Sequence, residues 1–220
     1  IKNFGADSIR WFILSDSPPS RDIQWSQEGI LASHKFIQKI WALTNKIEDY
    51  KNSNENTEED KNVYKFINKM IYNITRNIEN FQYNVVIANF HEIYNELDKF
   101  LNNKKSSTKA LKTSMVKTLI CLIPFTPHIA FECLKKIDKS FNPKNIKWPS
   151  YDKKLLVEEE YNIIVQINGK KRGIFKIPAN SDENIVFQEA KKVENVKKTM
   201  GSNKIKKYIY VKNRLINLII

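Results

Sequence analysis

The sequence predicts an α-helical bundle followed by a small α+β domain whose elements run in the order β-β-α-β-β. From residue 5 to about residue 137, apolar side chains recur at spacings of three and four, the period of an amphipathic helix. Short polar connectors separate these long segments, which favours antiparallel packing in an up-and-down bundle. After Pro149 the pattern changes to short runs of β-branched residues around a hairpin-forming dipeptide.

Local signals bound the first two helices. A helix over residues 6–14 ends before Pro18 and Pro19, because a proline pair cannot continue a helix and biases the preceding residue toward extended geometry. After a polar loop, Ser26 stands at an N-cap position and precedes apolar residues at helical spacing. We therefore expect a long amphipathic helix to about Tyr50.

Four further helices complete the predicted bundle. Thr57 followed by Asp60 resembles a capping box, with Asp where Glu is usual, and starts a third helix with an apolar stripe from Val63 to Phe81. Asn84 is expected to cap a fourth helix. Two more helices are expected over residues 108–123 and 128–137, with Pro124 and Pro127 between them.

The predicted small domain begins with a β-hairpin. Residues 161–167 are rich in β-branched side chains and meet Asn168-Gly169, the dipeptide that best populates the left-handed angles of a type I′ turn. Gly169 and Gly173 are expected to serve this hairpin. The other expected elements are a return strand over 173–177, a helix over 181–193, a short helical piece near Val196, and strands over 204–211 and 215–220.

Positive charge is concentrated in the last part of the chain. The 220 residues carry a net charge of +13, with 32 Lys and 5 Arg, beside 30 Ile and 25 Asn. That composition fits an AT-rich genome, which would spread lysines evenly. Residues 161–220, however, hold 13 Lys and Arg against 4 Asp and Glu, a net of +9, whereas residues 1–160 hold 24 against 20, a net of +4. This predicts an anion-binding face on the small domain; the alternative is a solvated sheet face whose lysines discourage edge aggregation.

No residues point to catalysis, a cofactor or a metal. The three histidines are far apart, the five glycines form no phosphate-binding loop, and Cys121 and Cys133 lie in apolar stretches typical of buried thiols. The chain has no run of about 18 apolar residues and no signal-peptide layout at its start, so we expect a soluble, cytoplasmic protein. Because the sequence starts as if inside a domain, we also expect the C-terminal piece of something longer.

Several stretches, in order and spacing, resemble one family of enzymes. Residues 4–12 and 124–130 resemble motifs shared by several class I aminoacyl-tRNA synthetases, and residues 15–26 resemble the link of one family among them into its anticodon-binding-type bundle. The more specific stretches are Trp148-Pro149 with Asp152 and Leu155-Leu156, then Val165 to Gly173, Ile177-Pro178-Ala179, and Val211 to Ile219. Together they are similar to the C-terminal third of leucyl-tRNA synthetases.

The chain departs from the family's pattern at three places. Phe131 stands where an acid is common, Leu134 where Trp is common, and Lys212-Asn213 where Pro-Gly is usual. None of these changes conflicts with a packing or turn role, since Asn also enters left-handed geometry.

The resemblance implies an enzyme that joins leucine to its tRNA with ATP and Mg²⁺ and edits mischarged products. It also implies that the adenylate-forming motifs and the editing pocket lie upstream of this chain. It implies an anticodon-binding-type bundle and a small domain that reaches the elbow and long variable arm of a leucine-accepting tRNA. Expected partners are this tRNA and the upstream catalytic and editing domains of a monomer, with no membrane and no ATP or metal bound by the fragment. The expected domains are a connector from the catalytic core (1–25), the bundle (26–137), a linker (138–160) and the C-terminal tRNA-binding domain (161–220).

The candidate tRNA-binding residues lie mainly in the small domain. Arg21 and Trp25, in the loop before the long helix, are open between packing and touching the acceptor-side tRNA backbone. Arg10 is expected to form a salt bridge from its helix to a loop. A phosphate-binding surface is expected from Lys170, Lys171, Arg172, Lys204, Lys206 and Arg214.

Three alternatives remain open from the sequence. The first is the C-terminal part of another class I synthetase, for isoleucine, valine or methionine, against which the Asn168-Gly169 hairpin domain argues. The second is a free-standing RNA-binding module with no enzyme attached. The third is membrane-surface binding, which needs a basic amphipathic helix, whereas the densest charge lies on predicted strands.

Overall fold

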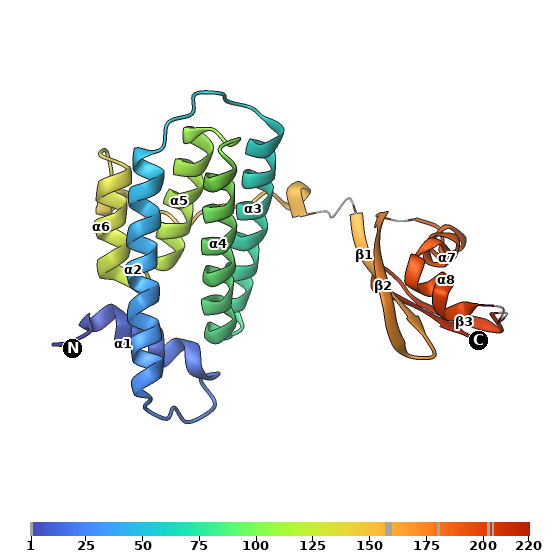
Figure 1. Ribbon diagram of the computed structural model, residues 1–220. Helices are drawn as coiled ribbons and strands as arrows, with labels where there is room; N and C mark the ends of the chain where they lie inside the picture. Colours follow the sequence, from blue (N-terminus) through green and yellow to red (C-terminus); the bar gives the residue numbers. More distant parts are fainter. Residues whose placement is uncertain (1, 157–159, 180, 202, 204) are drawn as a thin grey trace. The chain divides into compact units, whose positions relative to one another are not determined.

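The computed structural model describes residues 2–156, 160–179, 181–201, 203 and 205–220, and it divides the chain into two compact units. The first unit, Ile1–Leu156, is a helical bundle, and the second, Val157–Ile220, is a sheet with short helices (Figure 1). The predicted fold class, a bundle followed by a small α+β domain, is therefore confirmed. None of the helices within the described residues has the length and apolar character needed to cross a membrane.

The helices of the first unit begin and end close to the predicted positions. Those from α2 to α6 lie alongside one another, and α1 lies at one end of the bundle (Figure 1). Their bounds are α1 Gly5–Asp16, α2 Gln27–Asp49, α3 Glu58–Glu79, α4 Tyr83–Asn103, α5 Thr108–Leu122 and α6 Pro127–Ile137, followed by the short 3₁₀ turns η1 Pro143–Asn145 and η2 Lys153–Leu156.

Two of the predicted N-caps are confirmed, and two other predictions about helix starts are wrong. The hydroxyls of Ser26 and Thr57 accept hydrogen bonds from Gly29 N and Asp60 N at 3.2 and 3.0 Å. The return half of the capping box does not form, because the Asp60 carboxylate accepts from a residue in another part of the bundle. Asn84 does not cap α4, which starts one residue earlier and has no side-chain cap.

Aromatic rings pack together in the core of the bundle at the end where α1 lies. Trp11 of α1 is 1% exposed and stacks on Phe36 of α2, with ring centroids 4.6 Å apart. Trp11 also contacts Phe90 of α4, which packs edge-on against Phe125 after α5. Arg10 bonds to Asp7 within α1 rather than to a loop. Because α1 contributes Trp11 to the core, the segment before the long helices is part of the bundle.

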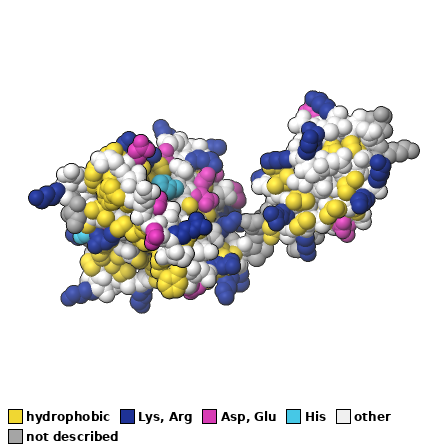
Figure 2. Space-filling model, turned by 90° about the horizontal axis from the view of Figure 1, so that it is seen from below, with side chains coloured by type: hydrophobic (Ala, Val, Ile, Leu, Met, Phe, Trp, Pro, Cys, Tyr) yellow, Lys and Arg dark blue, Asp and Glu magenta, His cyan; other side chains and the backbone are white. Residues whose placement is uncertain are grey.

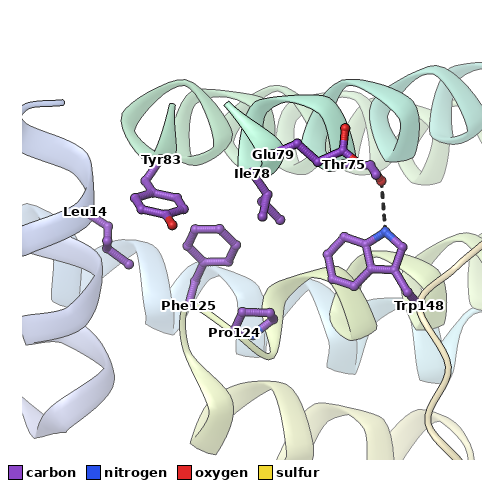
Figure 3. A pocket seen from close by; sticks show the side chains of 8 residues that line it. All are labelled: Leu14, Thr75, Ile78, Glu79, Tyr83, Pro124, Phe125 and Trp148. Carbon is purple, nitrogen blue, oxygen red and sulfur yellow. Dashed lines mark hydrogen bonds between the residues drawn. The ribbon is translucent and has the colours of Figure 1, made fainter. Parts of the chain in front are cut away.

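The segment after α6 is bonded to α3. The indole N–H of Trp148 donates to the Thr75 hydroxyl at 2.8 Å (Figure 3). Asp152 lies four residues after Trp148, and its backbone exchanges two hydrogen bonds with the side-chain amide of Asn68 on α3, at 2.9 and 2.7 Å. Part of the segment expected to join the two units therefore belongs to the surface of the bundle.

The second unit is a four-stranded sheet, in its described residues, with the strand order β2-β1-β4-β3. The two hairpin pairs are antiparallel, and the central strands β1 and β4 are parallel. Asn168 and Gly169 have φ angles of +48° and +80°, as a type I′ turn requires. The bounds are β1 Glu160–Ile167, β2 Lys170–Pro178, α7 Glu183–Lys192, α8 Glu194–Met200, β3 Lys207–Val211 and β4 Leu215–Ile219.

The two short helices cover one face of this sheet. Alternate residues of the central strands point toward them and are fully buried, as Val165 and Ile216 are. Val186 of α7 and Val196 of α8 complete this core. Gly173 has a role beyond the hairpin, since a Cβ there would meet the Val193 side chain between α7 and α8 at 2.5 Å.

Candidate nucleic-acid interface

The excess positive charge of residues 161–220, in the second unit, belongs to the sheet and its turns. The four acids of residues 161–220 all lie between residues 182 and 194, at the start of α7 or within α7 and α8. The two helices also carry four lysines, so the helical layer is neutral. The other nine Lys and Arg residues belong to the strands and their connections, where residues 161–220 have no acid. Figure 2 shows many Lys and Arg side chains and few acids on the visible surface of this unit.

The strand register brings four of the predicted residues to one end of the sheet. Lys170, Lys171 and Arg172 begin β2, directly after the hairpin turn. Lys206 immediately precedes β3, and its backbone N–H donates to Ile219 O at the end of β4. Because β1 and β4 are parallel, both end here. The two basic segments are separated by three strand spacings, or about 14 Å.

The hairpin turn is held against β4. The backbone N–H of Asn168 donates to Leu218 O at 2.9 Å, and that of Gly169 donates to the Asn217 side chain at 3.0 Å. In return, the Asn168 side chain accepts from the N–H of Ile220 at 3.3 Å. These bonds fix the position of the lysines that follow the turn relative to the end of the chain.

Arg172 sits at an irregularity in the sheet. Val165 of β1 pairs with Gly173 but Gln166 pairs with Lys171, so Arg172 is an extra residue in β2. Its Nε is buried without a hydrogen-bond partner, although the residue as a whole is half-buried. The Nε–H is therefore an unsatisfied buried donor, which a phosphate oxygen does not reach in this conformation.

The predicted set does not form a single cluster. Arg214 precedes β4 at its opposite end, about 16 Å from Ile219 for five residues of strand. Lys204 lies outside the described residues. Arg21 and Trp25 belong to the first unit, where the Trp25 ring is 60% exposed and packs edge-on against Phe12 at 5.3 Å, and Arg21 is exposed.

Sequence reasoning missed an exposed apolar set on the sheet. Ile174 of β2 and Ile209 and Val211 of β3 are 49%, 50% and 42% exposed. They lie on the face that α7 and α8 leave open. The alternation of lysine and apolar residues before Val211 predicts a strand with two different faces. It does not predict which of these faces the helices cover.

Within the described residues, neither the cysteines nor the possible metal ligands form a recognisable reactive or metal-binding site. Burial raises the pKa of the Cys121 thiol to about 12 and that of Cys133 to about 11, which keeps both protonated near neutral pH. Among the described residues, no group of three His, Cys, Asp or Glu is placed to hold a metal ion.

An apolar pocket of about 450 Å³ lies in the first unit, between the ends of α1, α3 and α5 (Figure 3). Phe125, Pro124 and Tyr83 line it, and Trp148 closes one side. Its hydroxyl at Thr75 already accepts from the Trp148 indole. The pocket presents mainly apolar side chains, and its other polar groups are the Glu79 carboxylate and the Tyr83 hydroxyl.

Comparison with known proteins gives consistent matches over the whole chain. Residues 60–187 match the family model described as the anticodon-binding domain of tRNA ligase. All of the chain matches leucine-tRNA ligases of Fervidobacterium nodosum, at 37% identity, and of Fusobacterium nucleatum, at 32%. The chain spans 28% and 27% of these relatives' length.

A solved structure resembles the fold of 99% of the chain. It is the ternary complex of Agrobacterium radiobacter K84 agnB2 LeuRS with tRNA and LeuAMS, matched at 26% identity and a TM-score of 0.77. This chain covers 28% of that protein.

Proposed function

We propose that this chain, which belongs to the family of anticodon-binding domains of tRNA ligases, forms the tRNA-binding C-terminal part of a leucine-tRNA ligase. A solved relative is a complex with tRNA, which supports this assignment. The observation that carries it is the separation of charge within residues 161–220, where every acid lies with the helices and the excess cations lie on the sheet and its turns. Binding to a polyanion depends on such a one-sided field.

In this proposal the basic end of the sheet positions the tRNA. Lys170, Lys171, Arg172 and Lys206 contact phosphates, which fix the register of a nucleic acid without reading its sequence. Arg214 makes a separate phosphate contact near the other end of β4. Lys204 is also proposed to contact a phosphate. Recognition of a leucine-accepting tRNA then rests on the shape of its elbow and variable arm.

The chemistry is proposed to lie in the remaining part of such an enzyme. Relatives are more than three times as long as this chain, and aminoacylation with ATP and Mg²⁺, with editing, is assigned to the parts that this chain does not cover. The contribution of this chain is to hold the tRNA so that its 3′ end reaches the active site. Arg21 and Trp25 of the first unit are proposed to touch the acceptor side of the same tRNA.

The test is a binding titration of this chain with leucine tRNA, with and without its variable arm, across salt concentrations. Wild-type affinity should fall steeply with salt and should drop when the arm is deleted. The double variant Lys170→Glu/Lys171→Glu should bind at least about tenfold more weakly and lower the salt slope by about 2, one for each lost phosphate contact.

The matched control is Lys197→Glu/Lys198→Glu, two adjacent exposed lysines of α8 with the same change in charge. Because they lie in the neutral helical layer, their reversal should change affinity only slightly. Equal losses in the two double variants would show that only the net charge matters. An unchanged affinity and salt slope in the Lys170/Lys171 variant would refute the proposal.

A further inference from the structure

The sheet of the second unit has one face that no described helix of that unit covers. On β3, Lys207, Ile209 and Val211 are exposed, while the alternate residues Tyr208 and Tyr210 pack toward the core. The register places Ile219 opposite Lys207 and Leu215 opposite Val211, so these residues share the open face. On the same face, the pairing of β1 with β2 adds three further pairs of residues: Ile164 with Ile174, Gln166 with Lys171, and Asn162 with Lys176.

This open face combines apolar surface with positive charge. Ile174 and Ile209 are each about half exposed, at 49% and 50%, although isoleucine is usually buried. Lys171 and Lys207 lie on the same face at its basic end. Among the strand residues the one acid is Glu160, the first residue of β1, and it lies at the end of that strand opposite to the end where Gln166 pairs with Lys171. The acids of residues 161–220 all belong to the helical layer.

This combination selects the class of partner. A protein surface of average composition presents both signs of charge and gains little from a face whose basic end carries only lysines. RNA presents phosphates for the lysines and, next to them, ribose and base surfaces that are less polar. Charge complementarity therefore favours RNA as the occupant of the open face.

We propose that the open face of the sheet is the surface on which the tRNA docks, with Ile174, Ile209 and Val211 packing on its sugars or bases and Lys171 and Lys207 on its phosphates. This inference rests on the proposed function. It specifies which face of the sheet contacts the tRNA and adds apolar side chains to the lysine contacts. The helical face, with its paired charges Lys192–Glu189 and Lys198–Glu194, points away from the RNA.

The contact does not use aromatic stacking. Tyr208 and Tyr210 are the aromatic residues of β3, and both point to the helical side, where Tyr208 stacks on Phe187 with centroids 4.5 Å apart. Isoleucine and valine pack by shape without reading base edges. The open face therefore recognises the form of a folded RNA rather than its sequence.

The test compares matched substitutions on the two faces of the second unit in the full chain. Ile209→Ser on the open face is paired with Ile185→Ser on α7, since these isoleucines are equally exposed, at 50% and 52%. Lys207→Ala is paired with Lys197→Ala of α8. Circular dichroism confirms that each variant is folded before leucine tRNA binding is titrated against salt.

The two open-face variants should differ in their salt dependence. Ile209→Ser should weaken binding about fivefold or more with the salt slope unchanged, because it removes apolar contact and no charge. Lys207→Ala should weaken binding and lower the slope by about 1. The α7 and α8 variants should stay within about twofold of wild type.

The outcomes separate this inference from the proposed function. If wild-type chain binds tRNA and the Lys170/Lys171 reversal weakens it, but Ile209→Ser and Lys207→Ala bind as wild type does, the basic end is supported and the docking face is wrong. If Ile209→Ser instead abolishes self-association seen by sedimentation and leaves RNA affinity unchanged, the open face binds protein and the inference is overturned. A wild-type chain that binds no tRNA defeats both.

Discussion

The carboxylate of Asp7 in α1 accepts a hydrogen bond from the backbone N–H of Ile129 in the first turn of α6, at 2.8 Å, across 122 positions of sequence. Its other oxygen accepts from Nδ1 of His128 at 2.9 Å. Thr126, at the N-cap of α6, makes no side-chain cap bond. Asp7 therefore performs the capping role from another helix and joins the start of the chain to the last helix of the bundle.

Removal of this carboxylate should destabilise the bundle. Asp7→Ala leaves a helix N–H and Arg10 without their acceptor, so we expect a loss of about 1–3 kcal/mol in the free energy of unfolding. Asp7→Asn keeps one acceptor oxygen and should lose less. Urea unfolding followed by tryptophan fluorescence measures this selectively, because all four Trp residues lie in the first unit. Asp16→Ala, at the exposed end of the same helix, is the control, and an equal loss there would contradict the role of Asp7.

The bond pair between Asn68 and the Asp152 backbone should hold residues 148–152 on α3. Asn68→Ala removes both bonds, so this segment should open more often and let trypsin bind and cleave the backbone after the exposed Lys147, Lys153 and Lys154. We expect cleavage there to be at least about tenfold faster, which corresponds to about 1.4 kcal/mol in the opening equilibrium. Asn62→Ala, an exposed position on α3, should cleave as wild type does. Equal rates in all three proteins would show that these bonds do not hold the segment.

Features that depend on neighbouring residues in sequence were predictable. Ser26 and Thr57 cap helices because a hydroxyl reaches an N–H three residues on, and the Asn168-Gly169 turn depends only on two residues that tolerate left-handed angles. Asp60 shows where this reasoning fails. It has the right spacing to complete a capping box, but its carboxylate accepts from Ser107 N, 47 residues away, at 2.7 Å.

The candidate interface was predictable as a composition but not as a surface. The count of lysines placed it in the last 60 residues. The position of Lys170 and Lys206 at the same end of the sheet depends on the parallel pairing of β1 with β4, which no local pattern encodes. In the same way, the exposure of Ile209 follows from the side on which α7 and α8 pack. An alternating strand has two candidate faces, and only the tertiary structure chooses between them.

The buried thiols should be nearly inert in the folded protein. Because burial raises the pKa of Cys121 to about 12 and that of Cys133 to about 11, from 9.0, the thiolate fraction at pH 8 falls. Alkylation at pH 8 should then be at least about a hundredfold slower than in urea, since each pKa unit lowers the thiolate about tenfold. Mass spectrometry of iodoacetamide-treated protein measures both sites, and rates equal to those in urea would show that the thiols are not buried.

Gly173 should be required because Val193 approaches the backbone of β2. In Gly173→Ala the new Cβ would lie 2.5 Å from Val193 Cγ1, and a β-branched side chain has little freedom to move away. We expect a loss of about 1–3 kcal/mol in the stability of the second unit from this overpacking. Hydrogen exchange of the β1 amides measures it, because these amides belong to the second unit alone.

A second substitution separates this clash from a general effect of losing glycine in the hairpin. Val193→Ala should restore part of the stability of Gly173→Ala, because it removes Cγ1, the atom that the new Cβ at residue 173 would overlap. It should not rescue Gly169→Ala, where a Cβ meets no atom within 4 Å and the cost comes from the φ of +80°. If Val193→Ala restores neither variant, or restores both equally, Gly173 acts only through the hairpin backbone and not through the packing of the α7–α8 junction on the sheet.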